Sequence, residues 1–399
     1  MAKQIQDAYI VAATRTPVGK APRGMFRNVR PDDLLAFALK SALAKSPGLD
    51  PAAIDDVIVG CAMPEAEQGM NVARIGLLLA GFPNTVSGMT INRFCSSGTQ
   101  AVALAADRIR LGEADVMIAA GTESMSMVPM GGNKPSFSPD VFGKDENVAI
   151  AYGMGITAER VAAQWKVSRE DQDMFAAESH RRAVRATESG EFKDEVTPYP
   201  IRDHVPDLAT REVSVNARDA ANDEGPRRDT SPEALAKLRP AFSLKGSVTA
   251  GNSSQMSDGA AAVILMSEAA LARYNLRPLG RFLGYSVAGV PPDIMGIGPV
   301  KAIPKVLKQT GVKLEDVDWI ELNEAFAAQS LAVINSVGLN PANVNPMGGA
   351  IALGHPLGAT GAIRSATTIH ALQRHKLKYG MVTMCVGTGQ GAAGIFERV

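Results

Sequence analysis

The chain has 399 residues, of which 46% are hydrophobic and 21% are charged, and its 41 basic side chains balance its 41 acidic ones. This composition is typical of a globular protein with room for two or three domains. The zero net charge excludes attraction to nucleic acid or to an anionic membrane through bulk charge. No apolar run is long enough to span a membrane.

The cysteine and histidine content indicates a reducing compartment. The 3 cysteines do not make a disulfide framework, and residues 1–7 lack the apolar core of a signal peptide. The 5 histidines form no metal-binding motif with cysteine or glutamate. We therefore expect a cytoplasmic protein without a bound metal ion.

The first third of the chain alternates predicted strands and helices. An apolar strand at 8–13 is followed by a helix at 31–45 whose first residue is proline, which suits the first helical turn. Next come a strand at 54–60, an alanine-rich helix at 98–111 and a strand at 116–120. This alternation predicts a mostly parallel sheet covered by helices.

Residues 122–249 interrupt this pattern. The segment is rich in glycine, proline, serine and charge, with helical patches near 155–165 and 169–189. We interpret it as an inserted loop domain. The alternation of strands and helices that began in the first third then ends with a buried strand at 260–266.

The last third repeats the order of the first, which indicates an internal duplication. It contains a strand at 281–287, a proline-led helix at 299–309, a strand at 317–323, an alanine-rich helix at 358–373 and a strand at 381–385. Packing of the two repeats about a pseudo-twofold axis would bring their equivalent helix starts together.

The repeat divides the chain into three predicted domains. An N-terminal half at 1–121 is completed by 250–271, a loop domain covers 122–249, and a C-terminal half covers 272–399.

Three reactive side chains lie on tight turns beside these elements. Cys95 precedes the first alanine-rich helix, His355 precedes the second, and Cys385 ends the last of these strands before a glycine-rich turn. A nucleophile and two acid–base groups on turns are more typical of catalysis than of packing. A helix N-terminus and a nearby imidazole both lower the pKa of a thiol, so we expect Cys95 to be activated.

The other cysteine and histidines are interpreted without a catalytic role. Cys61 follows an apolar strand and is expected to be a buried small side chain. The remaining histidines are expected at the surface: His180, His204, His370 and His375. A solvated helix face is expected for three arginines: Arg181, Arg182 and Arg185.

Five ordered motifs resemble those of the thiolase family over essentially the whole chain. They are Asn-Arg-Phe-Cys-Ser-Ser-Gly at 92–98, Gly-Asn-Ser-Ser-Gln at 251–255 with Asp-Gly-Ala-Ala at 258–261, Asn-Glu-Ala-Phe at 323–326, Gly-His-Pro at 354–356 and Cys-Val-Gly at 385–387. The resemblance implies an α/β fold. Two βαβαβαββ halves would form a five-layer αβαβα core, and an inserted loop domain would cover the active site.

The resemblance also implies ping-pong acyl transfer. Cys95, activated by His355, would attack a 3-ketoacyl-CoA, and Cys385 would protonate the enolate of acetyl-CoA that leaves. Free CoA, deprotonated with help from His355 or Cys385, would then take the acyl group. One oxyanion hole would be His355 with a water held by Asn323, and the other would be the backbone N–H groups of Cys95 and Gly387.

Coenzyme A would be a substrate, and no resident cofactor is expected. The family's CoA-binding positions correspond here to Met154, Arg227, Phe242, Ala250, Ser254 and Phe326. Without the resemblance, Arg227 and Arg228 would be interpreted as a solvated loop pair, and the two phenylalanines as core. The family also implies a homodimer or homotetramer and is compatible with a hydratase/dehydrogenase partner subunit.

Two departures from the family pattern bear on the substrate. Short-chain biosynthetic thiolases carry His-Met-Gly where this chain has Gly153, Met154 and Gly155. The missing histidine favours the degradative branch, which performs the last step of fatty-acid β-oxidation. Thr388 stands where many relatives have glycine, next to the expected oxyanion donor.

Three alternatives remain open at this point. One is a short-chain acetoacetyl-CoA thiolase working in the condensation direction. A second is a condensing ketosynthase, which usually has two histidines; Asn323 in place of the second one, together with Cys385, argues against it. A third is an inactive thiolase-like subunit that binds acyl-CoA, against which the intact Cys95, His355, Asn323 and Cys385 argue.

Overall fold

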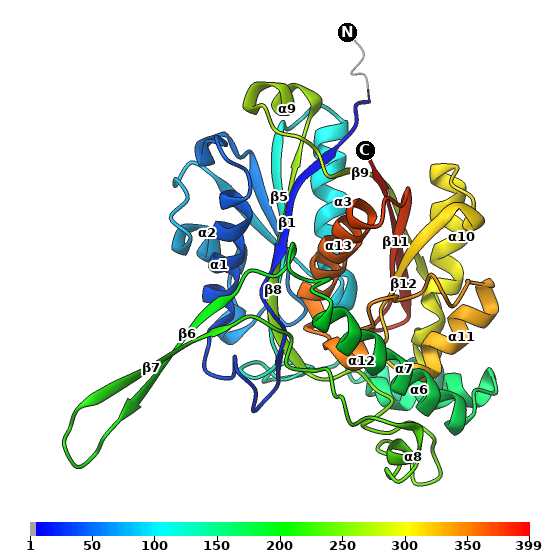
Figure 1. Ribbon diagram of the computed structural model, residues 1–399. Helices are drawn as coiled ribbons and strands as arrows, with labels where there is room; N and C mark the ends of the chain where they lie inside the picture. The colour runs from blue at the N-terminus through cyan, green and yellow to red at the C-terminus, as the bar shows by residue number, and fades with distance from the viewer. Residues whose placement is uncertain (1–4) are drawn as a thin grey trace.

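The computed structural model describes residues 5–399, and two copies of one strand order form its centre (Figure 1). Residues 1–4, part of the segment judged to lack a signal peptide, lie outside the described residues. The first copy has the order β4-β3-β5-β8-β1. Its strands are β1 (Tyr9–Arg15), β3 (Asp56–Gly60), β4 (Ser87–Ile91), β5 (Val116–Ser124) and β8 (Ser257–Met266).

The second copy has the same strand order as the first. At the position equivalent to β4 it has an isolated β-bridge and no strand. The strands β10-β11-β12-β9 lie side by side, and Val344 forms a parallel bridge to Ile320 where β4 would lie. These strands are β9 (Gly280–Gly289), β10 (Val317–Leu322), β11 (Tyr379–Val386) and β12 (Gln390–Arg398). The structure therefore confirms the predicted duplication.

The prediction of a mostly parallel sheet was wrong: β3 with β4, β3 with β5 and β10 with β11 are parallel, and the other described strand pairs of this sheet are antiparallel. The apolar pattern of a single strand does not report the direction of the strand beside it.

The two copies meet edge to edge through β1 and β9. Tyr9 pairs with Arg281 and Ile10 with Gly280 in antiparallel register, which joins the copies into one 10-stranded sheet. The short strand β2 (Gly19–Lys20) adds to β8.

Helices form three layers around the two copies of the sheet. Helices α1 (Pro31–Ala44) and α2 (Val72–Leu79) pack on the outer face of the first copy, and α10 (Gly298–Thr310) packs on the second with α11 (Ala327–Val337) beside it. Helices α3 (Ser97–Arg110) and α13 (Leu357–Arg374) fill the layer between the copies. The predicted five-layer αβαβα arrangement is thus confirmed.

The two central helices touch backbone to backbone. A Cβ atom on Gly98 would lie 2.4 Å from Ala362 N, and one on Gly361 would lie 2.1 Å from Thr99 N. Any larger side chain would push the helices apart, because real Cβ atoms essentially never come this close. These glycines bring the starts of α3 and α13 together, and with them the turns that carry Cys95 and His355.

Local signals set several helix ends. Pro31 occupies the first turn of α1, and the Ser168 side chain accepts a hydrogen bond from Asp171 N at the start of helix α7 (Arg169–Glu188). Helices α10 and α11 end at Gly311 and Gly338, whose φ values of 74° and 75° are left-handed.

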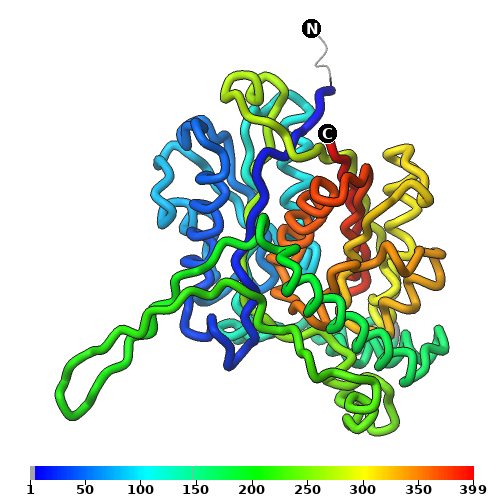
Figure 2. Tube along the Cα trace, in the orientation of Figure 1, coloured from blue at the N-terminus to red at the C-terminus, as the bar shows by residue number. Residues whose placement is uncertain are grey.

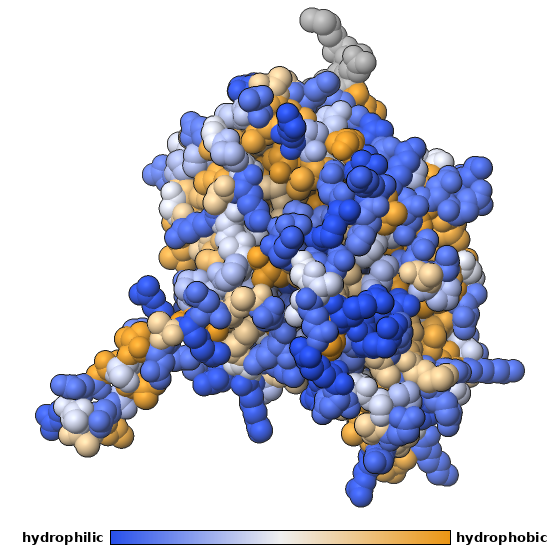
Figure 3. Space-filling model, in the orientation of Figure 1, coloured by the Kyte–Doolittle hydropathy of each residue, from blue (hydrophilic) through white to orange (hydrophobic). Residues whose placement is uncertain are grey.

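The segment between β5 and β8 contains the two predicted helical patches. They are α6 (Met154–Gln164) and α7 (Arg169–Glu188), which pack against α11. A hairpin of β6 (Tyr199–Pro206) and β7 (Val213–Ala220) projects from the body (Figures 1 and 2). Exposed apolar side chains lie along it (Figure 3): Val205, Leu208, Val213 and Val215. The division into three domains stays a prediction.

Short elements complete the described chain. The remaining helices are α4 (Asp140–Gly143), α5 (Asp145–Val148), α8 (Pro232–Leu235), α9 (Glu268–Tyr274) and α12 (Ala350–Leu353). The 3-10 helices are Pro51–Ala53, Ala66–Gln68, Phe94–Ser96, Ala149–Ala151, Pro292–Ile297 and Leu314–Asp316. Over residues 5–399, no helix is long and apolar enough to cross a membrane.

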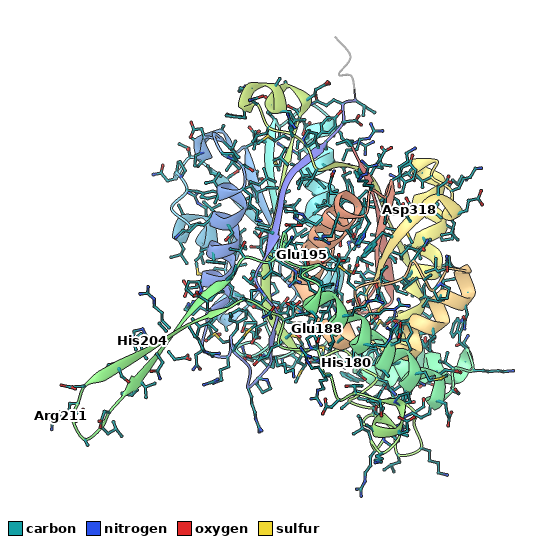
Figure 4. The ribbon with its side chains drawn as sticks, in the orientation of Figure 1. His180, Glu188, Glu195, His204, Arg211 and Asp318 are labelled. Atoms are coloured by element: carbon teal, nitrogen blue, oxygen red, sulfur yellow. The ribbon has the colours of Figure 1, made fainter. Side chains whose placement is uncertain are left out.

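Two of the four histidines expected at the surface are not there. His180 is buried on α7 and accepts a hydrogen bond from Arg227 N at Nδ1, while His204 is exposed on the projecting hairpin (Figure 4). His370 is partly buried on α13, where its Nε2 hydrogen-bonds the carbonyl of Ala13. His375 is exposed as expected. The prediction was wrong for His180 and His370 because their partners lie far away in the sequence.

The expected solvated arginine face is also only partly correct. Arg181 and Arg185 are exposed, whereas Arg182 is partly buried and donates to the carbonyl oxygens of Val344 and Asn345. Arg182 therefore ties α7 to the loop that bridges β10. Cys61 is fully buried, as predicted.

Candidate active site

The structure brings the three predicted turns together. Cys95 lies in the 3-10 helix before α3, and this turn contacts both α13 and β11. Cys95 lies near Cys385 and near the backbone N–H of Gly387, and His355 lies on the turn that leads directly into α13. The three turns are therefore neighbours in the folded chain.

The sulfur of Cys95 is held in a buried pocket of backbone donors. The Cys95 residue is 8% exposed, and the N–H groups of Cys95 and Gly387 lie close enough to its sulfur to lower the pKa of the thiol. Burial raises this pKa by more than the two N–H groups lower it, and the charge of Glu123 adds a smaller increase, so the pKa is raised to about 12. The expected net lowering of this pKa is thus wrong, because loss of hydration outweighs the local donors. The resting side chain is a neutral thiol.

His355 is a neutral base whose tautomer follows from its neighbours. Its Nδ1 lies 2.6 Å from Thr360 Oγ1, and that hydroxyl donates its only hydrogen to the Pro356 carbonyl at 3.1 Å. Nε2 lies 3.2 Å from Asn323 Nδ2, which can only donate, so we assign Nε2 as the acceptor and Nδ1 as the nitrogen that carries the proton and donates to Thr360 Oγ1. Burial, and then the Arg364 guanidinium, lowers the pKa of His355 to about 3. A neutral Nε2 can accept a proton from a thiol.

Asn323 follows directly after β10 and is fixed through its backbone. Its N–H donates to the Thr383 carbonyl at 2.9 Å, and its carbonyl accepts from Gln329 Nε2 at 3.2 Å. The side-chain Oδ1 is buried and has no partner among the described residues. This oxygen is available to accept a hydrogen bond from a bound water or from substrate.

Cys385 is the next-to-last residue of the buried strand β11 and lies close to Cys95. Burial raises the pKa of the Cys385 thiol, and the nearby Cys95 sulfur raises it further. The side chain is thus a neutral thiol that can give up a proton.

Thr388, directly after Gly387, has a left-handed φ of 64°, which is strained for a β-branched residue. The glycine of many relatives would adopt this backbone without strain.

Four of the six predicted CoA-binding residues gather beside Cys385. Met154 packs against the buried cluster that contains Phe326 and Cys385. The rings of Phe242 and Phe326 meet edge to face with centroids 6.0 Å apart, and Ser254 N donates to the carbonyl of the residue before Phe326. Together these side chains form a mostly apolar wall next to a reactive thiol.

The other two predicted CoA-binding residues lie outside this group. Ala250 is exposed. Arg227 is exposed at a surface cavity of about 500 Å³ that Arg181 and Arg228 also line. The two neighbouring arginines are paired with Glu178 and Glu188, respectively.

Sequence reasoning missed Thr360 and Glu123. No local pattern marks Thr360, because its role depends on the turn that brings His355 back over α13. Glu123 is the one ionisable residue in the otherwise uncharged strand at 116–124, and a carboxylate in such a run is a signal of function.

Two family models together match almost all of this chain. The model described as thiolase, N-terminal domain, matches residues 8–269, and the one described as thiolase, C-terminal domain, matches residues 276–398. The chain belongs to the thiolase family. This confirms the family and the fold predicted from the five motifs.

Individual relatives of this thiolase cover its full length. It is 49% identical over 399 residues to the 3-ketoacyl-CoA thiolase of Bacillus subtilis, covering 98% of this chain and 100% of the relative. The acetyl-CoA acetyltransferase of Bacillus anthracis has a similar structure, with a TM-score of 0.88, 39% identity and 100% of each chain covered. The dimeric peroxisomal thiolase of Saccharomyces cerevisiae also has a TM-score of 0.88, with 40% identity over 99% of this chain and 98% of its own.

Proposed function

We propose that this thiolase cleaves 3-ketoacyl-CoA with free CoA, to give acetyl-CoA and an acyl-CoA shortened by two carbons. The observation that carries the proposal is the meeting of the three buried turns that hold Cys95, His355 and Cys385. The reaction is the last step of fatty-acid β-oxidation. Support for this substrate class comes from the full-length likeness to the Bacillus subtilis enzyme.

The first half-reaction uses all three side chains. Nε2 of His355 takes the Cys95 proton as the sulfur bonds to C3 of the substrate. The C2–C3 bond then breaks, and its electron pair leaves with acetyl-CoA as an enolate. Cys385 gives its proton to C2, which leaves an acylated Cys95, an imidazolium and a Cys385 thiolate.

The second half-reaction restores the enzyme. The thiol of CoA gives its proton to the Cys385 thiolate, and its sulfur attacks the acyl carbonyl on Cys95. The Cys95–acyl bond breaks, and the released thiolate recovers its proton from His355. All three side chains are then neutral again, which is the state that their burial favours.

Both steps place negative charge on an oxygen, and the site offers two sets of donors. The N–H groups of Cys95 and Gly387 already converge on the sulfur and would stabilise the oxyanion of the attacked carbonyl. The unpartnered Asn323 Oδ1 would hold a water that, with His355, stabilises the enolate oxygen.

The predicted CoA contacts divide by chemistry. Met154, Ser254, Phe242 and Phe326 would line the narrow pantetheine path toward Cys385. Arg227, with Ala250 at the exposed end, would hold the anionic nucleotide end, because a guanidinium matches phosphate oxygens.

We also propose a homodimer, or a homotetramer built from it, in the cytoplasm. Strand β4 is the exposed edge of the sheet, and apolar residues are exposed beside it: Met70, Leu78, Leu79 and Met89. A second copy of the chain would pair with this edge and cover these side chains. Sedimentation equilibrium of the purified protein measures the number of chains in the assembly, and a monomer would contradict the proposal. A hydratase/dehydrogenase subunit remains a compatible partner.

The short-chain alternative keeps a specific observation in its favour, the structural match to an acetyl-CoA acetyltransferase. The deciding measurement is CoA-dependent cleavage of acetoacetyl-CoA beside a medium- or long-chain 3-ketoacyl-CoA. We expect a higher kcat/KM on the longer chain. Activity confined to acetoacetyl-CoA would place the enzyme with the short-chain acetyltransferases, and no activity with either would leave the inactive acyl-CoA-binding subunit.

Gly153 is expected to help set this preference. Its φ of −61° suits any residue, and a Cβ there would meet nothing within 4 Å, so the position beside Met154 has room for a side chain. Gly153→His should lower the kcat/KM ratio of long-chain to acetoacetyl substrate by roughly tenfold, the scale on which a pocket discriminates chain length. Gly153→Ala is the control for backbone effects. An unchanged ratio in the histidine variant would remove Gly153 as a determinant.

A further inference from the structure

Glu123 is a buried carboxylate surrounded by neutral donors. It lies near the end of β5 and is fully buried. Oε2 accepts from Ala62 N at 2.8 Å and Gly358 N at 2.7 Å, while Oε1 accepts from Met63 N at 3.3 Å and from the amide of Gln68. None of these donors carries a charge. Evolved proteins rarely bury a carboxylate without a cation unless many hydrogen bonds hold it.

The hydrogen bonds of Glu123 require its ionised form. Each carboxylate oxygen faces at least two hydrogens of donors, so a carboxylic acid proton would point at a hydrogen already present. The Sγ of Cys61, 3.9 Å from Oε1, adds a weak donor. Burial nevertheless raises the pKa of Glu123, and the hydrogen bonds lower it.

One side of Glu123 holds the turn that carries His355. Gly358 lies in the first turn of α13, three residues after His355. A Cβ on Gly358 would lie 2.6 Å from both Ala62 N and the Cα of Cys61, so only glycine lets this helix start reach the carboxylate. The hydrogen bond from Gly358 N therefore ties α13 to Glu123 on β5, and the bond from Ala62 N joins the loop after β3 to the same carboxylate.

The other side of Glu123 leads to the turn that carries Cys95. The carbonyl of Ala62 accepts from Asn92 Nδ2 at 3.0 Å, and Asn92 Oδ1 accepts from Phe94 N at 2.7 Å. Phe94, directly before Cys95, has a left-handed φ of 43°, which needs such support in a residue with a side chain. A continuous chain of hydrogen bonds thus runs from Gly358 through Glu123, Ala62 and Asn92 to the turn of the nucleophile.

We propose that Glu123 is a positioning residue that joins the Cys95 turn of one half to the His355 turn of the other and places a fixed negative charge beside the nucleophile. The first task sets the distance over which the proton of Cys95 travels. The second task keeps the resting pair as thiol and imidazole, because the negative charge disfavours a thiolate nearby. The inference uses the proposed acyl transfer for one of its tests only.

Other ionisable groups near Glu123 are few and do not compensate its charge. The thiol of Cys61 contacts the carboxylate, and Cys95 lies within range of its charge. Asp258 on the neighbouring strand β8 is bonded by Ser124 and Ser126 and adds no positive charge. His355, on the turn before α13, is neutral. Removing the charge at position 123 is therefore expected to lower the pKa of Cys95, because no nearby cation compensates that charge.

The test compares Glu123→Gln, which removes the charge, with Glu123→Asp, which keeps the charge but shortens the side chain. The first readout is the pH dependence of Cys95 alkylation by iodoacetamide, with the labelled peptide identified by mass. We expect the midpoint to fall by about one pH unit in Glu123→Gln and to stay near the wild-type value in Glu123→Asp. This readout needs no substrate, so it separates the inference from the proposed function.

The second readout is steady-state thiolysis. Both variants should lose roughly 10- to 100-fold in kcat with KM for CoA changed less than about threefold, because they disturb the reacting groups and not the CoA site. Glu195→Gln is the matched control, since Glu195 is an equally buried carboxylate, paired with Arg15 and bonded by Thr367 in the middle of α13. It should lower the melting temperature without moving the alkylation midpoint.

Three outcomes would overturn the inference. They are wild-type alkylation and kcat in Glu123→Gln, a midpoint shifted equally in the glutamine and control variants, and a loss expressed in KM alone. If the glutamine variant does not fold, Glu123→Asp still decides on positioning through its kcat.

Discussion

Cys95→Ala is expected to abolish acyl transfer, with a loss of roughly 10⁴-fold or more in kcat. The sulfur forms the bond that carries the acyl group between the two half-reactions, and alanine offers no substitute nucleophile. Cys385 cannot take over, because the N–H groups of Cys95 and Gly387 converge on the sulfur of Cys95. Removing a single buried sulfur should leave the fold in place.

The measurement is thiolysis of the best 3-ketoacyl-CoA together with mass spectrometry of the intact protein after incubation with acyl-CoA. The wild type should gain one acyl group on Cys95, and the alanine variant should gain none. Cys95→Ser is the matched control, since its hydroxyl keeps the shape of the side chain but is a far weaker nucleophile. Normal turnover by the alanine variant would refute the mechanism.

Cys385→Ala is expected to lower overall turnover by roughly 10²- to 10⁴-fold, the range for loss of a general acid or base. The enolate of acetyl-CoA would leave without a nearby proton donor, and CoA would enter without a nearby acceptor. Acylation of Cys95 by a simple acyl-CoA should be slower but still detectable, because His355 still activates Cys95 while the leaving CoA thiolate loses its proton donor.

Exchange of deuterium from solvent into acetyl-CoA separates proton transfer by Cys385 from nucleophilic attack by Cys95. Deuterium incorporation at C2 from solvent should slow in Cys385→Ala, while the acylated Cys95 still appears by mass spectrometry. If Cys95 can no longer be acylated in this variant, the roles of the two cysteines have been misassigned. Cys385→Ser tests whether a weaker acid at the same place restores part of the exchange.

The layered fold could be predicted from the sequence because its signals are local. The proline at the start of α1 and the alternation of apolar strands with helices are readable within short windows of the chain. The duplication was visible because both halves repeat these windows in the same order. The hairpin of β6 and β7 was missed, since its strands carry neither a buried face nor a tight two-residue turn.

The sequence also predicted that the turns of Cys95, His355 and Cys385 lie together, but it could not predict the protonation states of these side chains. Cys95 was expected to have a lowered pKa from its place before a helix, yet burial raises that pKa to about 12. The burial of Cys95 depends on the elements of the other half that pack against its turn, α13 and β11, and no local sequence pattern shows this packing. The same reason explains why His180 and His370 were expected at the surface and are not.

Short motifs were enough to predict the family and the order of elements, and to propose Cys95, His355 and Cys385 as nucleophile, base and acid, because residue types within local windows carry this information. How these groups act together depends on contacts between the two halves of the folded chain. The tautomer of His355 depends on Thr360, and the link between the two turns depends on Glu123, which lies 235 residues from its partner Gly358. Hydrogen bonds over such separations exist only after the halves have packed, since the glycines of α3 and α13 must first let two backbones meet.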